Sequence, residues 1–328
     1  MDGAAPETRR PQLDLDHERF CCRQRTSNCL VFAARSLNYT EVHLKRSLGL
    51  AAAVLLALAV SGVTPSASPA RFIPGLNRVK ADKGEVYRKG CLMGHTRLRS
   101  GACRFGDTRS GKKVVLLGDS HAMQWGPGLI RLAKRKHWQV IALTRASCPA
   151  ALVHIDYYCD KWRRNSLRRI RRMKPGLVVV ASAANSEAYE VNSNGWTLNR
   201  ASSEPLLVDG MIRTLRKLRR WSTRTVVLRD QAVTPYSVTA CLRYNVSHPS
   251  NCGFNPYRPA SFSYDFKAAR RVKRVPIIDP MRMLCEGGWC HAVDHNYLIY
   301  RNQGHLSASF TRFRYLWLGA KLGDPWKS

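Results

Sequence analysis

Short aliphatic runs recur from about residue 85 to the end of the chain, and basic amphipathic segments lie between them. Five runs are typical of strands buried on both faces of a sheet, at residues 114–117, 140–143, 177–181, 225–228 and 275–278. The other segments repeat apolar residues at helical spacing, over residues 128–136, 162–173, 206–221 and 263–271, with a closing helix at 307–322. Strands that alternate with helices predict an α/β fold in which a parallel sheet carries helices on both faces.

A separate apolar run, LGLAAAVLLALAVSGV, occupies residues 48–63. Lys45 and Arg46 precede it and TPSASPA follows it, which is the layout of a secretory signal cleaved after Ala67 or Ala70. The run is slightly short for a membrane span, so a retained anchor and a buried core helix stay open as alternatives. An exported chain keeps the basic flank inside, so we expect the part from residue 71 to lie outside the cytoplasm, secreted or anchored to the membrane.

This run divides the chain into four expected parts. Residues 1–47 are a polar tail that is cytosolic or precedes the true start of the protein. Residues 48–63 are the signal or anchor, and residues 64–84, with Pro, Ser, Ala and Gly, are a linker. Residues 85–328 form the α/β domain.

The net charge of +32 is extreme and falls almost entirely after residue 70. Such a field favours anionic partners: envelope polymers, lipid headgroups or nucleic acid. Nucleic acid is not expected, because the chain looks exported and few aromatic residues stand among the basic ones. The Arg-rich segments 161–174 and 213–224 are expected to be solvated helix surface, with attraction of an anionic polymer as the alternative.

Cysteine usage agrees with export. Three of the 11 cysteines precede the apolar run, and the other eight follow it in close pairs. An even number on the exported side indicates disulfides. The sequence does not fix the connectivity, but the simplest pairing joins neighbours: Cys91–Cys103, Cys148–Cys159, Cys241–Cys252 and Cys285–Cys290. The alternative is a zinc site at Cys285, Cys290, His291 and His295, although the other cysteine pairs lack histidine partners.

The stretch VVLLGDSHAMQWGPG, residues 114–128, carries the first candidate chemistry. Gly118 permits a tight turn after the strand, and Ser120 begins the apolar segment that follows. Ser120 could be a nucleophile at the carboxyl edge of the sheet, where ligands bind in such folds. Taken alone, it is more simply the N-cap of a helix.

A second stretch, YRNQGHLSAS at residues 300–309, favours the interpretation of Ser120 as a nucleophile over that of a helix N-cap. His305 follows the last strand and precedes the closing helix, so it could return to the same sheet edge as Ser120. A serine and a histidine at one edge are the two groups that nucleophilic acyl chemistry requires.

Together, GDSHAMQW, YRNQGHLS and the segments Cys148–Cys159 and Cys285–Cys290 resemble the SGNH-hydrolase domain that is often fused to integral-membrane acyltransferases of family 3. The resemblance spans about residues 85–325. It implies a flavodoxin-like three-layer α/β/α sandwich, with Ser120 as nucleophile and His305 as general base. It also implies oxyanion donors from the Ser120 N–H and Asn185, whereas the family's glycine donor has no match in LTRASCPA.

One residue departs from the family pattern. The family has Asp-x-x-His, and here Asn302 stands at the Asp position. An Asn can accept a hydrogen bond from the imidazole but cannot stabilise its charged form, and the equivalent change in serine proteases lowers the rate by about 10⁴. Asp294 or Asp279 could supply the missing carboxylate. His121, next to the nucleophile, is a weaker candidate for contact with the substrate.

The resemblance therefore implies O-acyl transfer or ester hydrolysis on envelope polysaccharide through an acyl-serine, without a metal or cofactor. The family's membrane helices are not seen in this chain, so a separate integral-membrane acyltransferase is the expected acyl donor. The alternative function is a catalytically impaired module that binds anionic envelope polymers, and Asn302 favours it.

Overall fold

The computed structural model describes residues 71–184, 191–193, 196–256 and 263–327. A seven-stranded sheet lies at its centre, in the order β1-β4-β3-β5-β8-β9, with β2 paired to β4. Every pair is parallel except β2 with β4. The strands are β1 (Leu92–Met93), β2 (Arg104–Gly106), β3 (Lys113–Gly118), β4 (Gln139–Arg145), β5 (Leu177–Ala181), β8 (Arg224–Leu228) and β9 (Ile277–Ile278).

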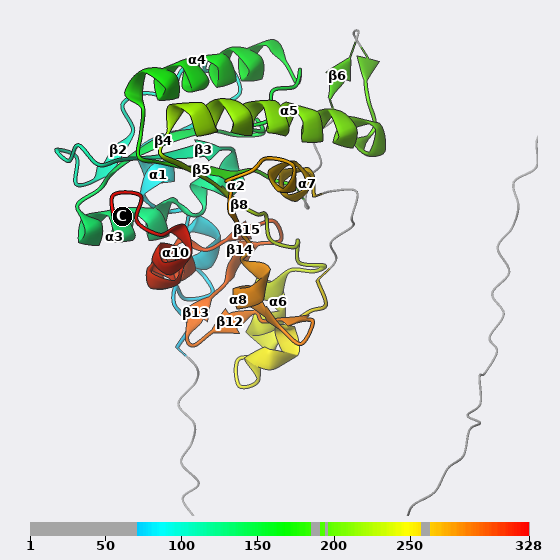
Figure 1. Cartoon of the computed structure of the whole chain (residues 1–328). Helices are drawn as coiled ribbons and strands as arrows, with labels where there is room; N and C mark the ends of the chain where they lie inside the picture. The colour runs from blue at the N-terminus through cyan, green and yellow to red at the C-terminus, as the bar shows by residue number, and fades with distance from the viewer. Residues whose placement is uncertain (1–70, 185–190, 194–195, 257–262, 328) are drawn as a thin grey trace, which may run out of the picture. The chain divides into compact units, whose positions relative to one another are not determined.

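Helices cover both faces of this sheet (Figure 1). One face carries α4 (Tyr157–Met173), α5 (Arg200–Trp221) and α7 (Tyr264–Arg270), and the other carries α3 (Gly126–Lys136), α9 (Ala308–Phe313) and α10 (Tyr315–Leu322). Successive residues of β3 alternate between the two cores, as Leu116 and Leu117 do. The expected three-layer α/β/α sandwich is confirmed.

Smaller elements complete the described part. The remaining helices are η1 (Val79–Ala81), α1 (Gly84–Arg88), α2 (Ser120–Met123), α6 (Val238–Tyr244), η2 (Pro249–Cys252) and α8 (Met281–Leu284). Four two-stranded ribbons pair β6 (Asn192–Ser193) with β7 (Trp196–Thr197), β10 (Cys285–Glu286) with β11 (Trp289–Cys290), β12 (Val293–Asp294) with β13 (Tyr297–Leu298), and β14 (Tyr300–Asn302) with β15 (His305–Leu306).

Several predicted elements have other bounds in the structure; the helices predicted at 162–173 and 206–221, for example, are Tyr157–Met173 and Arg200–Trp221. Two further differences concern the last strand of the central sheet and the closing helix. The last strand begins at Ile277 instead of residue 275, because Pro276 has no N–H to donate to a neighbouring strand. The single closing helix is two helices that meet at Arg314. The guanidinium of Arg314 pairs with the carboxylate of Asp294 at this junction.

Part of the segment expected to be a linker packs against the domain. Ile73 forms a backbone bridge with Tyr297, and the Asp82 carboxylate accepts the Ser309 N–H at 2.7 Å. The boundaries at residues 47, 63 and 84 stay predictions.

In the part of the chain that the structure describes, no helix has both the length and the apolar character to cross a bilayer. The apolar run 48–63 lies outside the described residues.

The four expected disulfides are present. They join Cys91 to Cys103, Cys148 to Cys159, Cys241 to Cys252 and Cys285 to Cys290, with S–S distances from 1.96 to 2.10 Å. Each closes a short loop near the end of a strand or helix. The sulfurs of Cys285 and Cys290 bond to each other, so neither is available as a zinc thiolate.

The turn after β3 depends on the absence of a side chain at Gly118. Its φ is +147°, and a Cβ placed there would lie 1.7 Å from the carbonyl oxygen of Ala181 on β5. That oxygen belongs to the backbone of a central strand, so it cannot move aside cheaply. The position therefore requires glycine on both conformational and steric grounds.

We expect Gly118→Ala to lower the free energy of unfolding by about 3 kcal/mol or more, because the clash and the left-handed backbone add. Urea denaturation measures this change. Gly111→Ala is the matched control, since a Cβ there meets nothing within 4 Å. Equal stability of the two variants would contradict the steric account.

Candidate active site

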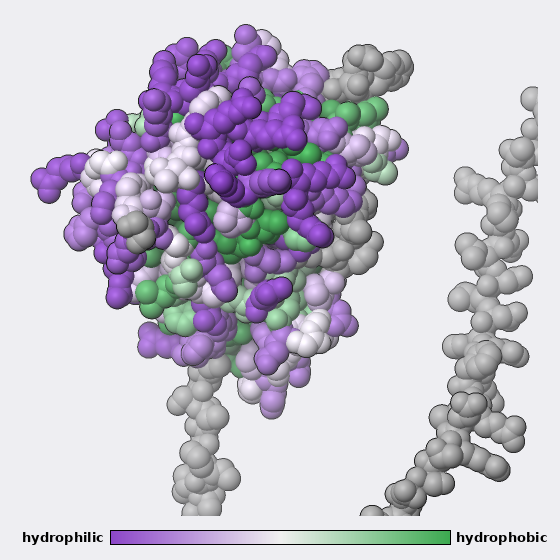
Figure 2. Space-filling view, viewed as in Figure 1, coloured by the Kyte–Doolittle hydropathy of each residue, from purple (hydrophilic) through white to green (hydrophobic). Residues whose placement is uncertain are grey.

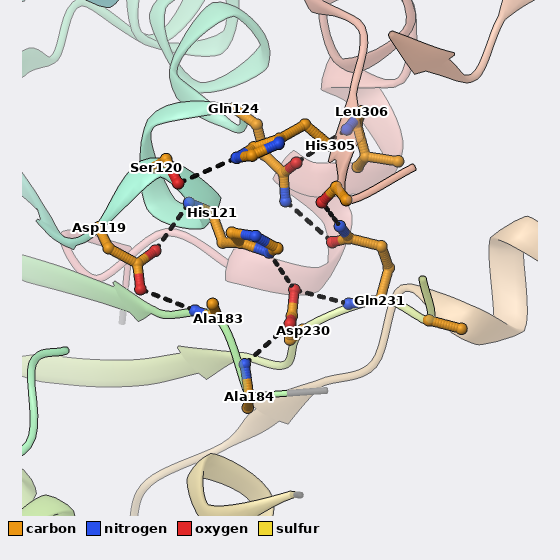
Figure 3. Close-up of polar contacts among 12 residues, drawn as sticks. Asp119, Ser120, His121, Gln124, Ala183, Ala184, Asp230, Gln231, His305 and Leu306 are labelled. Atoms are coloured by element: carbon orange, nitrogen blue, oxygen red, sulfur yellow. Dashed lines mark hydrogen bonds and ion pairs between the residues drawn. The ribbon is translucent and has the colours of Figure 1, made fainter. Parts of the chain in front are cut away.

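Ser120 is placed by Asp119, which caps α2. One oxygen of the Asp119 carboxylate accepts the His121 N–H at 2.7 Å, and the other accepts the Ala183 N–H at 2.8 Å. The capping residue is thus Asp119, and Ser120 is the first residue of the helix. The interpretation of Ser120 as a mere N-cap is therefore wrong. Asp119 ties the start of α2 to the chain that leaves the adjacent strand β5 (Figure 3).

His305 lies against this serine. Its Nε2 is 2.9 Å from Ser120 Oγ, and its Nδ1 is 3.1 Å from Asn302 Oδ1. Asn302 and His305 both belong to the β14–β15 ribbon. His305 is 185 positions from Ser120 in the sequence. The structure therefore brings together the three residues that the sequence analysis proposed for catalysis: Ser120, His305 and Asn302.

Two glutamines fix the ribbon that carries His305. Gln124, just after α2, accepts the Leu306 N–H at 2.8 Å and donates to Gln231 Oε1 at 2.8 Å. Gln231 in turn donates to the Gly304 carbonyl at 2.9 Å. Figure 3 shows Gln124 between Leu306 and Gln231, next to His305. Leu306 and Gly304 flank His305, so the pair of amides holds the histidine from both sides.

Asn302 has a defined amide orientation. Its Oδ1 also accepts the backbone N–H of Gly304 at 3.2 Å. A flipped amide would set its own N–H groups against that donor, so Oδ1 faces both Gly304 and His305. This favours the His305 tautomer with the proton on Nδ1, which leaves the Nε2 lone pair directed at the Ser120 hydroxyl.

The electrostatic surroundings keep His305 neutral. Burial lowers the pKa of His305 to about 2, and nearby His121, Arg301 and Lys83 add to this effect. Burial acts because a charged imidazolium loses solvation, and the nearby cationic groups disfavour another positive charge. His305 is thus an unprotonated but weak base.

Neither carboxylate considered as a substitute for the family Asp is a partner of His305. Asp279 Oδ2 lies 2.7 Å from Arg229. Asp294 pairs with Arg314 and with His295, the latter at 2.9 Å. Both carboxylates are committed to basic side chains of their own region.

A carboxylate that the sequence analysis missed does lie in the site, beside the second histidine. Asp230 Oδ1 is 2.6 Å from His121 Nδ1, and both side chains are buried. The ring centroids of His121 and His305 are 4.6 Å apart. Asp230 comes two positions after β8 (Arg224–Leu228), so the rule that ligands gather at the carboxyl ends of parallel strands could have drawn attention to it.

Asp230 has the hydrogen bonds that a buried carboxylate needs. It accepts the backbone N–H groups of Ala184 at 2.8 Å and Gln231 at 3.0 Å, besides its contact with His121. Its own N–H donates to Asp265. Burial, together with the charge of Asp230, raises the pKa of the Asp265 carboxyl to about 6. These contacts satisfy the Asp230 oxygens and fix the side chain next to His121.

The expected oxyanion residue Asn185 lies outside the described residues. The chain reaches it through Ala183 and Ala184, whose N–H groups bind Asp119 and Asp230. The two residues before Asn185 are therefore held by carboxylates that also hold α2 and His121.

Residues 90–313 match the family described as the SGNH domain fused to AT3 domains. No curated protein sequence matches this chain.

Among solved structures, the periplasmic domain of a lipopolysaccharide acetyltransferase from Salmonella ser. Paratyphi A has the same fold. It aligns with a TM-score of 0.50 and 16% sequence identity, over 72% of this chain and 87% of that one. A GDSL-like lipase from Bacteroides thetaiotaomicron aligns with a TM-score of 0.36 and 11% identity, over 64% of this chain and 87% of that one. With its family match extending over residues 90–313, this chain belongs to the SGNH domain family of the type fused to AT3 acyltransferases.

Proposed function

We propose that this chain is a serine enzyme that transfers or hydrolyses O-acyl groups, most simply O-acetyl groups, on cell-envelope polysaccharide. The observation that carries the proposal is the 2.9 Å contact between Ser120 Oγ and His305 Nε2. A serine hydroxyl becomes nucleophilic when an adjacent base takes its proton. The Nδ1-protonated tautomer of His305 presents Nε2 for that step.

In the first half-reaction, His305 Nε2 takes the Ser120 proton as Oγ attacks the ester carbonyl carbon. The Ser120 N–H and Asn185 are the proposed donors to the oxyanion that forms. When the tetrahedral intermediate collapses, the ester C–O bond breaks and the departing alcohol oxygen takes the proton from Nε2. The acyl group is then bonded to Ser120.

In the second half-reaction, His305 takes the proton of an incoming hydroxyl whose oxygen attacks the acyl carbon. Ser120 leaves and recovers the proton. Water as the acceptor gives hydrolysis, and a sugar hydroxyl gives O-acyl transfer. The proposed acyl donor is a separate integral-membrane acyltransferase, which the family's fusion to AT3 domains supports.

Two observations support an envelope location and a polysaccharide substrate. The similar Salmonella structure is the periplasmic domain of a lipopolysaccharide acetyltransferase. The four disulfides are typical of an oxidising compartment. We propose that the apolar run 48–63 exports the domain, as a cleaved signal or as a retained anchor.

His121 is proposed as a positioning residue that borders the substrate. Asp230 holds its ring at 2.6 Å, and the ring packs against His305. The ring therefore limits how the proposed general base can turn, and His121 directly follows the proposed nucleophile in the chain. Its presence also contributes to the low pKa of His305.

A second candidate function is a binding module that retains the fold with little catalysis. Asn302 in place of a carboxylate, together with the pKa of about 2 at His305, favours it, because a base that weak takes the serine proton unfavourably. The two candidates differ in whether Ser120 reacts with an acylating or phosphonylating probe.

We expect Ser120→Ala to abolish labelling by a fluorophosphonate probe and to lower hydrolysis of an aryl acetate by at least about 10³-fold. Gel fluorescence and initial rates measure the two effects. Ser250→Ala, at an exposed serine of η2, is the matched control and is expected to keep both activities. Labelling that persists in Ser120→Ala would exclude Ser120 as the nucleophile, and an unlabelled native protein would support the binding module.

We expect Asn302→Asp to raise both the rate and the pKa of His305. A carboxylate at Nδ1 stabilises the imidazolium, so the rate at pH 8 rises, by up to about 10⁴-fold, the size of the reverse change in serine proteases. The native rate should not fall between pH 8 and pH 5 through His305, whose pKa of about 2 keeps it unprotonated there. The variant, with a raised pKa, should lose rate as the pH falls through that value.

Initial rates from pH 4 to pH 9 test this expectation. Asn296→Asp adds the same charge at an exposed position of the β12–β13 turn and is expected to leave the profile unchanged. A native profile that already falls near pH 6 would contradict the lowered pKa of His305.

We expect His121→Gln to lower kcat by up to about 10²-fold with a smaller change in KM, because a misplaced base costs rate more than binding. It should also raise the pKa of His305 by removing an adjacent imidazole. Steady-state kinetics and the pH profile measure both. An unchanged kcat with a stable fold would show that His121 only fills space.

A further inference from the structure

A cavity of about 370 Å³ opens beside α4, away from the residues of the Ser120 site. The chain between β1 and β2 supplies one wall and α4 supplies the other, with β4 at the floor. The lining residues are Arg99, Ser100, Leu143, Asn165, Ser166, Arg168, Arg169 and Arg172. None of them takes part in the contacts around Ser120 and His305.

The cavity concentrates positive charge from its arginine side chains. Four of its lining residues are arginines and none is Asp or Glu. Among the described residues, no carboxylate lies within ion-pair distance of any of the four. Four guanidiniums around one cavity repel one another, and a bound anion offsets this repulsion.

The backbone holds one of these arginines in place. Arg169 donates to the carbonyls of Ser100 at 3.3 Å, Gly101 at 2.7 Å and Ala102 at 3.1 Å. These bonds orient the guanidinium without neutralising it. Burial and nearby Arg104 lower the pKa of Arg169, which agrees with an uncompensated positive charge.

The cavity wall also contains a hydroxyl without a partner. Ser166 is 3% exposed, and its Oγ has no hydrogen bond within the described residues. A buried hydroxyl that lacks a partner destabilises the fold, so such groups commonly have a ligand or water. In this cavity a hydroxyl can donate to an anionic oxygen.

We propose that this cavity binds a phosphate group carried by an anionic polymer. Phosphate fits better than a carboxylate, because it accepts from several guanidinium forks at once and carries more negative charge. A single carboxylate would leave most of the four positive charges unbalanced.

The surface around the cavity favours a polymer over a free ion. Exposed basic side chains continue from the cavity along α4 and the neighbouring α5, at Arg164, Arg171, Arg213, Arg216, Lys217, Arg219 and Arg220. Figure 2 shows hydrophilic side chains gathered over the region that α4 and α5 occupy in Figure 1. A chain with repeated anionic groups can contact this surface while one phosphate occupies the cavity.

Calorimetric titration of the full chain with inorganic phosphate, at constant ionic strength, tests the cavity. We expect the double variant Arg99→Gln/Arg172→Gln to raise the Kd by at least about tenfold. Both arginines are exposed, so the fold should persist. The matched control is Arg216→Gln/Lys217→Gln, which removes the same charge from α5 outside the cavity. Equal losses in both variants, or no phosphate binding by the native protein, would overturn the proposal.

Ser166→Ala separates a ligand role from a structural one. It removes a hydroxyl with no partner, so without phosphate we expect an unchanged or raised Tm. With phosphate we expect weaker binding and a smaller rise in Tm than in the native protein. A lower Tm without phosphate together with unchanged phosphate affinity would contradict the assignment.

Two further probes distinguish the source of the phosphate. Inorganic polyphosphate should bind more tightly than inorganic phosphate, and its affinity should fall in the cavity double variant. Vesicles of phosphatidylglycerol should bind both double variants equally, through net charge alone. If the cavity double variant bound vesicles more weakly but bound polyphosphate as tightly as the native protein, the polymer proposal would be overturned in favour of a membrane. Fluorophosphonate labelling of Ser120 should be unchanged in the cavity variants, which keeps this test separate from the proposed catalytic function.

Discussion

The close approach of β3 and β5 at Gly118 determines where the Ser120 site forms. There is no space for a Cβ between Gly118 and the Ala181 carbonyl, and glycine also adopts the positive φ with which the chain leaves the sheet at this point. Asp119 then bonds to both the start of α2 and the chain after β5. Because Ser120 and His121 follow directly, their positions are set by the backbone of the two central strands. A serine held this way has little freedom to move away from His305, whose Nε2 lies 2.9 Å from its hydroxyl oxygen.

The negative charge of this site lies beside a different histidine from the one expected in the family. Asn302 supplies a neutral acceptor to His305, and Gly304 fixes the orientation of that amide. The buried carboxylate is Asp230, which holds His121. The result is a neutral imidazole at His305 packed against His121, whose ring contacts the Asp230 carboxyl group. The geometry of a Ser–His pair is thus kept, while burial first, and then His121, Arg301 and Lys83, lower the pKa of His305, and both candidate functions are argued from that combination.

Many of the basic side chains lie on helices α4 and α5, apart from the Ser120 site. The Ser120 site lies at the carboxyl ends of the strands, whereas α4 and α5 carry an arginine-rich surface and its cavity on one face of the sheet. A field of this sign attracts anionic polymers over a distance, and a cavity converts that attraction into a localised contact. The fold thus separates the proposed active site from the arginine-rich surface.

The sequence by itself determined the parts that depend on neighbouring residues. Apolar periodicity predicted the strands and the layers, and short spacings predicted the four cysteine pairs. GDSH with a later His-Leu-Ser indicated Ser120 and His305 as the candidate nucleophile and base. Only the tertiary structure decided which carboxylate serves which histidine and how His305 is held. Asp230 and His121 are 109 positions apart, and Gln124 and Gln231 are 107 apart. Contacts of this kind depend on which strand ends meet in the sheet, and no local pattern records that order. The cap of α2 is itself a local contact, from the His121 N–H to Asp119, but the second oxygen of Asp119 binds a residue 64 positions away, and only the tertiary structure shows that contact.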